Sequence, residues 1–263
     1  MAECFSDFFA PFVGQNAAGL FGFGHFFLLL STLFLLFAGL FFSRRADERQ
    51  VQSVTLAITL LAFLMELGKM AFSIAVLQTD HPNELLPLYF CSLLLYMGPL
   101  AARGARVGQV FLATGGLIGG AIYLLFPTTS LLRYRALHFI PFHGFLWHGL
   151  LVYLGVLTLW RGGYRPRKGD LLLAALPIGI LCAAALLFNT VYNAFHISPA
   201  ANLMFLSADF PGTPLSLLYH FLGKAYTPLM ALGQMLLPYL LVRLGVCLAQ
   251  RFQLHDRTVS RER

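Results

Sequence analysis

The sequence has few charged residues. Only 11% of its 263 residues are Asp, Glu, Lys or Arg, whereas 58% are hydrophobic, and the mean hydropathy is +0.74. Soluble domains carry roughly 25% charged residues, so this composition excludes an ordinary soluble globular protein. The scarcity of charge predicts an integral membrane protein.

The chain also lacks the motifs of several common chemistries. It has no G-x-x-x-x-G-K-[ST] sequence, no H-E-x-x-H and no C-x-x-C, which argues against nucleotide hydrolysis and zinc protease sites. No soluble domain, low-complexity tract or internal repeat is visible. Cys4, Cys91, Cys182 and Cys247 lie at different predicted depths, so we expect no disulfide among them.

Seven apolar stretches are long enough to cross a bilayer, which takes about 20 residues. They are residues 21–42, 51–77, 85–102, 107–126, 142–160, 170–188 and 215–249. We therefore expect an all-α fold, a polytopic membrane bundle of about seven transmembrane helices. One domain would cover residues 1–250, with a basic cytoplasmic tail at 251–263. Because Glu3 and Asp7 precede the first stretch without any basic residue, we expect that helix to be retained rather than cleaved as a signal peptide.

The basic residues indicate an orientation. Most of the 18 lie in alternate loops, around Arg44, Arg103 and Arg165, and in the C-terminal tail, whereas the other loops hold only Arg133 and Arg135. The positive-inside rule then places the N-terminus outside and the C-terminus in the cytoplasm, in a cell membrane that we expect to be a bacterial inner membrane. The formal charge of +7 reflects this topology, and we expect no nucleic-acid partner.

A cysteine and a histidine fall at matching depth in two spans. Cys91 in "LPLYFCS" and His148 in "FLWHGL" each lie about six residues from the outer end. Pro87 suits the first turn of a helix, which would put Cys91 about one turn from a helix N-terminus, where a thiolate is favoured. Either side chain could also have a packing or hydrogen-bonding role. The sharper hypothesis is a Cys91 nucleophile with His148 as its base, and with His25 as a second base or substrate contact.

Amide side chains collect where the sixth span ends. Asn189, Tyr192 and Asn193 lie in "FNTVYNAFH", and Asn202 lies in the following segment, which three prolines break. Non-helical backbone at membrane depth must be buried in protein or line a cavity, so this segment is expected to be a re-entrant or capping loop over the outer face. The amides would cap the helix, or bind a polar headgroup or an oxyanion.

Three ionisable residues lie deeper in the spans. Glu66 and Lys69 are three positions apart on one helix, so mutual neutralisation is the simplest interpretation, and Lys224 lies in the seventh stretch. Charged groups in a bilayer are costly and often mark a substrate or ion path, which makes Glu66 and Lys224 candidate substrate contacts. His138 and His143 are nearer the membrane boundary, where we expect contact with solvent or lipid headgroups.

Several pieces of the sequence together are familiar. "LPLYFCS", the His148–Gly149 pair, "GYRP" at residues 163–166 and "NTVYN" followed by "NLMFLSADFPGTPLSLL" resemble the YwaF-type bacterial integral membrane family, which is related to the eukaryotic transmembrane protein 164 acyltransferases. The resemblance implies acyl transfer onto lyso-ether phospholipids by a cysteine and a histidine within the membrane. These two residues correspond to Cys91 and His148.

The resulting hypothesis is a membrane-embedded lipid acyltransferase, or acyl hydrolase, that acts on phospholipid or lysophospholipid near the outer leaflet through a Cys91 thioester. It requires no metal and no soluble cofactor. The alternative is a lipid or small-molecule transporter or receptor with a polar cavity open to the outer side, and with Glu66, Lys69 and Lys224 as coupling groups. A scaffold subunit without chemistry is a third possibility. The sequence gives no indication of the oligomeric state.

Overall fold

The computed structural model describes residues 7–11, 17–195 and 199–259. Within these residues, seven helices are long and apolar enough to cross a membrane. The spans are Phe23–Arg45, Glu48–Ala75, Pro82–Ala102, Arg106–Leu131, Phe139–Trp160, Asp170–Ala194 and Pro214–Arg251. The predicted all-α membrane bundle is confirmed, and its orientation in the membrane stays a prediction.

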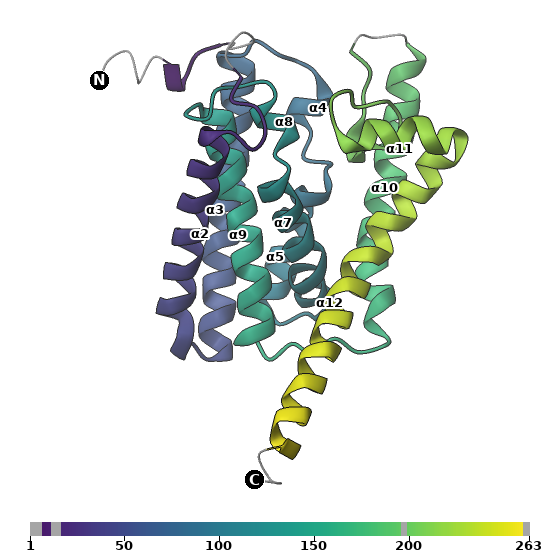
Figure 1. The fold of residues 1–263 in the computed structure, drawn as a ribbon. Coiled ribbons are helices and arrows are strands. Elements are labelled where there is room, and N and C mark those ends of the chain that lie inside the picture. The colour runs from purple at the N-terminus through teal and green to yellow at the C-terminus, as the bar shows by residue number, and fades with distance from the viewer. Residues whose placement is uncertain (1–6, 12–16, 196–198, 260–263) are drawn as a thin grey trace.

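The spans form a bundle whose central helices pack closely (Figure 1). The longer helices are α2 (Phe23–Phe42), α3 (Glu48–Ala75), α5 (Leu93–Ala102), α6 (Arg106–Phe111), α7 (Leu117–Leu125), α9 (Phe139–Trp160), α10 (Asp170–Ala194), α11 (Pro214–Leu222) and α12 (Tyr226–Val259). The short elements are η2 (Ser43–Arg45), α4 (Pro82–Leu85), η3 (Phe90–Ser92), the π-helical turn η4 (Leu112–Gly116), α8 (Thr128–Leu131), η5 (Leu203–Phe205) and η6 (Gly223–Ala225). Helix α9 packs against α2, α3 and α7, while α10 and α12 pair with each other.

Small residues let the central helices approach one another. A Cβ built on Gly98 of α5 would lie 2.3 Å from Thr59 Oγ1 of α3, and one built on Gly155 of α9 would lie 2.7 Å from the Leu112 carbonyl oxygen. Close backbone approach of this kind is the usual way in which membrane helices associate, because lipid supplies no hydrophobic drive between them. This close packing at Gly98 and Gly155 fixes the relative depths of α3, α5, α7 and α9.

Two spans are broken where the sequence disfavours helix. Leu86 is extended (φ −84°, ψ 125°), since a residue before proline avoids the helical region. The segment up to Tyr89 therefore stays non-helical between α4 and the turn η3. The overlong seventh stretch divides at Gly223, whose φ of +53° ends α11 in a conformation that glycine tolerates.

The segment between α10 and α11 enters the protein core. Leu203, Met204 and Leu206 are buried in the same apolar cluster as Leu94 and Leu151 of the central helices. We call residues 201–208 the buried loop. Its non-helical backbone is thus enclosed by protein, as the sequence led us to expect of a capping segment.

Candidate functional site

Cys91 lies in the turn η3, directly before helix α5. The prediction that a helix starting at Pro87 would carry Cys91 one turn inside it is wrong, because the chain stays extended through this region and α5 begins only at Leu93. The cysteine is half-buried and is a free thiol, like Cys182 and Cys247. Cys4 lies outside the described residues. Cys91 therefore occupies an irregular piece of backbone at the start of a membrane helix.

His148 is held in one orientation on helix α9. Its Nδ1–H donates to the Gly144 carbonyl oxygen at 2.7 Å, and its ring stacks on Tyr123 of α7 with centroids 3.7 Å apart and planes 6° apart. The side chain is buried, with 8% of its surface exposed. Because Nδ1 carries the proton, Nε2 has a free lone pair, and within the described residues no hydrogen bond reaches it. In this geometry Nε2 can accept a proton.

Tyr123 lies against the ring of His148. Its hydroxyl donates to Ser130 Oγ at 2.7 Å, since the serine hydroxyl donates in turn to a backbone carbonyl. A Cβ on Gly144 would lie 2.0 Å from the same hydroxyl, so the ring fits only against glycine. Cys91 packs against the apolar cluster that contains Trp147 and Leu151 of α9, the helix that carries His148. In the described part of the chain no direct hydrogen bond joins Cys91 to His148.

A second group of polar side chains adjoins this pair. Lys69 Nζ donates to Glu66 Oε1 at 2.6 Å, so these residues form the ion pair that their spacing predicts. Met65, on the same helix as this ion pair, packs against the apolar cluster that Cys91 also contacts. His143 stacks on Trp147 with centroids 5.6 Å apart. Contrary to its expected place at the boundary, His143 belongs to this interior cluster.

Both ring nitrogens of His25 form hydrogen bonds within the fold. Its Nδ1 accepts the backbone N–H of Phe21 at 3.0 Å, and its Nε2–H donates to the Leu124 carbonyl oxygen at 2.9 Å. The ring is 1% exposed. Because both nitrogens are occupied, the observed arrangement makes His25 an anchor between the start of α2 and the end of α7.

The predicted amide cluster holds the buried loop. Asn189 donates to the Leu203 carbonyl oxygen and to Ser207 Oγ, and it accepts the Leu203 N–H. Asn193 pairs in the same way with both backbone groups of Ala201. These amides satisfy backbone groups that lie at membrane depth, and this role alone accounts for their presence.

Asn202 secures the same loop internally. Its Oδ1 accepts the N–H groups of Ser207 and Ala208, and its Nδ2 donates to the Ala208 carbonyl oxygen. The loop also meets the chain just before Cys91, because the Asn202 N–H donates to Asn83 and Phe205 packs on Tyr89. Substrate contact by Asn189, Asn193 and Asn202 stays a prediction.

The remaining candidates lie outside this cluster. Lys224 is exposed in the turn η6. Tyr192 stacks on Phe188 of α10 and meets the ring of His81 edge to face. A role for either in substrate binding also stays a prediction.

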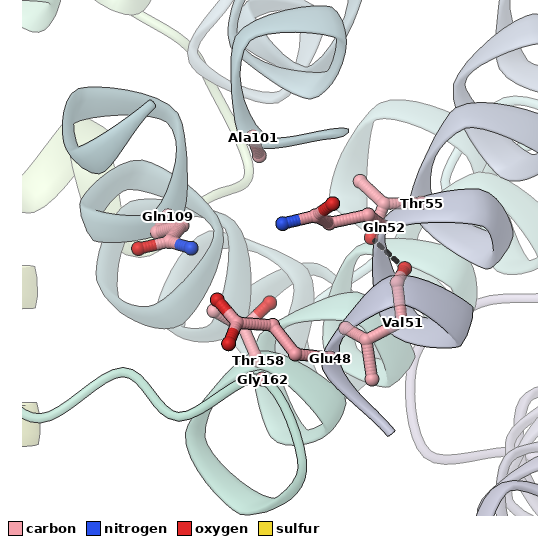
Figure 2. Close-up of a pocket in the computed structure, with 8 residues that line it drawn as sticks. All are labelled: Glu48, Val51, Gln52, Thr55, Ala101, Gln109, Thr158 and Gly162. Carbon is pink, nitrogen blue, oxygen red and sulfur yellow. Dashed lines mark hydrogen bonds between the residues drawn. The ribbon is translucent and has the colours of Figure 1, made fainter. Parts of the chain in front are cut away.

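A pocket and a groove lie away from Cys91. A pocket of about 10 Å³, room for about one water molecule, has polar lining that includes Glu48, Gln52 and Gln109 (Figure 2). Its Thr55 is about three turns of α3 from Glu66. An apolar groove of about 330 Å³ runs between α2 and α9 and is lined by Thr32, Phe145 and their neighbours. Among the described residues, no group of three or more His, Cys, Asp or Glu side chains is placed to hold a metal ion.

Comparison with known proteins identifies the family. A model of the TMEM164 family matches residues 20–242, a stretch that contains Cys91, His148 and the other candidate site residues. Searches of curated proteins and of solved structures gave no match. Since the family match extends over most of the 263 residues, the chain belongs to the TMEM164 family.

Proposed function

We propose that this protein is a membrane-embedded acyltransferase that moves an acyl chain from a phospholipid, through a thioester on Cys91, to a lysophospholipid or to water. The observation that carries the proposal is the fixed ring of His148, which has Nδ1–H bound to Gly144 and Nε2 free, on the helix whose Trp147 and Leu151 share an apolar cluster with the free thiol of Cys91. The resemblance of the sequence around Cys91 and His148 to the transmembrane protein 164 acyltransferases implies the same pair.

The chemistry follows the usual order of cysteine–histidine catalysis. His148 Nε2 takes the Sγ proton of Cys91, and the thiolate attacks the ester carbonyl carbon. The carbon–oxygen bond to the glycerol breaks, and the departing oxygen takes the proton from His148. An acceptor hydroxyl then attacks the thioester, and the thiol is restored. In enzymes without substrate, such hydrogen bonds are often long, so Cys91 and His148 would close on each other when lipid binds.

The backbone around Cys91 favours access to its sulfur. The extended backbone before η3 leaves Cys91 outside regular helix. A reacting lipid would then approach the sulfur without displacing helical hydrogen bonds.

Purified protein in proteoliposomes tests the proposal. With a phospholipid labelled in its acyl chain and a lysophospholipid acceptor, we expect Cys91→Ala to abolish transfer and His148→Ala to slow it by about 10² to 10⁴, as for loss of a general base. Cys182→Ala is the matched control, because it removes another buried thiol, on α10. Transfer at the normal rate in Cys91→Ala would refute the assignment. Lipid flux that persists in that variant would favour the transporter alternative.

A further inference from the structure

Two buried polar atoms on helix α9 have no hydrogen-bond partner among the residues that the structure describes. They are Nε2 of His143 and Nε1 of Trp147. The two residues are about one helical turn apart, and their rings stack with planes 26° apart. Trp147 is only 2% exposed. Buried polar groups are nearly always hydrogen-bonded, so two unpaired groups side by side indicate a place for a ligand that can satisfy both.

The chemistry of the two atoms defines that ligand. The indole Nε1–H can only donate. A neutral imidazole that carries its proton on Nδ1 has a lone pair on Nε2, and in this form His143 can accept. One donor beside one acceptor matches a hydroxyl group, whose oxygen accepts from Trp147 and whose proton is donated to His143.

The position of these atoms connects them to Cys91. Trp147 belongs to the apolar cluster against which Cys91 and Met65 pack. The ion pair of Lys69 with Glu66 lies on the neighbouring helix α3, and Glu66 is buried. Trp147, with His143 stacked on it, thus lies in the cluster against which the proposed nucleophile packs.

We propose that His143 and Trp147 form the subsite for the acyl acceptor, an alcohol group of a lysolipid or a water molecule, and that His143 is its general base. The proposal rests on the acyl transfer proposed above. The acceptor oxygen attacks the carbonyl carbon of the Cys91 thioester, forming a carbon–oxygen bond as the carbon–sulfur bond breaks. The hydroxyl proton passes to His143 Nε2 and then to the departing sulfur. The products are the new ester, or a fatty acid, and the free thiol.

This arrangement gives the two half-reactions different bases. His148 would serve the attack of Cys91 on the donor lipid, whereas His143 would serve the attack of the acceptor on the thioester. A purely structural role for His143 and Trp147, with a trapped water between them, would affect both half-reactions equally. The two half-reactions must therefore be measured separately.

The test follows the acyl group on Cys91. Purified protein in proteoliposomes receives acyl-labelled phospholipid, and label on the protein that hydroxylamine releases is measured before and after lysophospholipid is added. In Trp147→Phe and His143→Gln we expect acylation within about threefold of the normal rate but transfer at least about tenfold slower, so the thioester accumulates. Label that leaves as fatty acid without lysophospholipid identifies water as the acceptor, and label that leaves as phospholipid identifies the lysolipid alcohol.

Matched controls are available in the same chain. Trp160→Phe changes the other tryptophan, which is 49% exposed at the far end of α9, and His220→Gln changes an exposed histidine on α11. Both should acylate and transfer normally. Trp147→Phe keeps an aromatic ring, so it provides the test if His143→Gln fails to fold.

The outcomes separate the two proposals. Normal transfer in both variants, or an equal loss of both half-reactions in folded protein, overturns the acceptor subsite and leaves the acyltransferase proposal standing. No thioester on Cys91 in the unchanged protein overturns the proposed function itself, and the subsite with it.

Discussion

At the start of helix α9, His138 has both ring nitrogens in use. Nδ1 accepts the Ile140 N–H at 3.1 Å as the helix N-cap, and Nε2–H donates to the Ala10 carbonyl oxygen at 3.0 Å. The ring is fully buried and stacks on Tyr134. Burial lowers the pKa of His138 below its ordinary value of 6.5. A proton on Nδ1 would remove the cap, so the folded state requires the neutral ring.

This residue predicts a dependence of stability on pH. Below about pH 6.5 the unfolded chain binds a proton that folded His138 does not, so the free energy of unfolding falls as pH drops toward the folded pKa, and it is unaffected above that window. We expect His138→Asn, which keeps an N-cap acceptor but does not titrate, to flatten the decline between pH 7 and 5 by up to about 1.4 kcal/mol per pH unit. Thermal unfolding in detergent measures it, and equal slopes would contradict it.

Single residues of the candidate site were predictable from the sequence to different degrees. Cys91 and His148 stood out because a thiol and an imidazole at matching depth are unusual in apolar spans. His143 was assigned to the boundary because the span was placed from residue 142, whereas the helix begins at Phe139 and carries His143 inside. Nothing in the sequence assigned Trp147 to the site. A tryptophan in an apolar stretch is usually a packing residue, and only the structure shows that its N–H lacks a partner among the described residues.

At the scale of helices, the contact between α2 and α9 depends on a glycine, which has no side chain, at position 149. A Cβ on Gly149 would lie 2.5 Å from Thr32 Cγ2 and 4.0 Å from the Cβ of that threonine. We expect Gly149→Ala to lower stability by about 1–3 kcal/mol through overpacking. Thr32→Ser removes the offending methyl and keeps the hydroxyl, so the double variant should recover most of the loss.

Thermal unfolding in one detergent measures this coupling, with Gly68→Ala as the control. Gly68 lies within α3 and a Cβ there would meet no atom within 4 Å, so its replacement should be neutral or slightly stabilising. Strictly additive effects of the two changes would show that helix position is not set by this contact.

The helices themselves followed from apolar length, but their interruptions did so only in part. The break before the seventh span's main helix occurs at Gly223, inside a stretch that by length and composition counts as a single span. The prolines correctly indicated an irregular segment after α10. They could not show that Asn189, Asn193 and Asn202 would satisfy its backbone, because such pairings join groups that are brought together only by the fold.

For the whole molecule, the two ends of the bundle differ in charge. The turn η2 and the segments before α6 and α10 lie at one end with the last part of α12, whereas the start of α2, the chain before α4 and helix α11 lie at the other (Figure 1). Arg44, Arg106 and Arg165 belong to the first end, and Arg106 there binds Asp170 at 2.7 Å. Because the basic residues gather at one end, the positive-inside rule predicts that this end faces the cytoplasm.

Membrane-impermeant thiol labelling of intact bacterial cells tests that choice. In a variant whose native cysteines are replaced, Asp80→Cys lies at the end with the buried loop, and Lys168→Cys lies at the basic end; both positions are exposed. Because translocating basic loops is disfavoured, we expect Asp80→Cys to react in intact cells and Lys168→Cys to react only after the membrane is permeabilised. The reverse pattern would place the basic end outside. Cys91 would then lie in the inner half of the membrane, and its acyl donor and acceptor would have to come from the cytoplasmic leaflet.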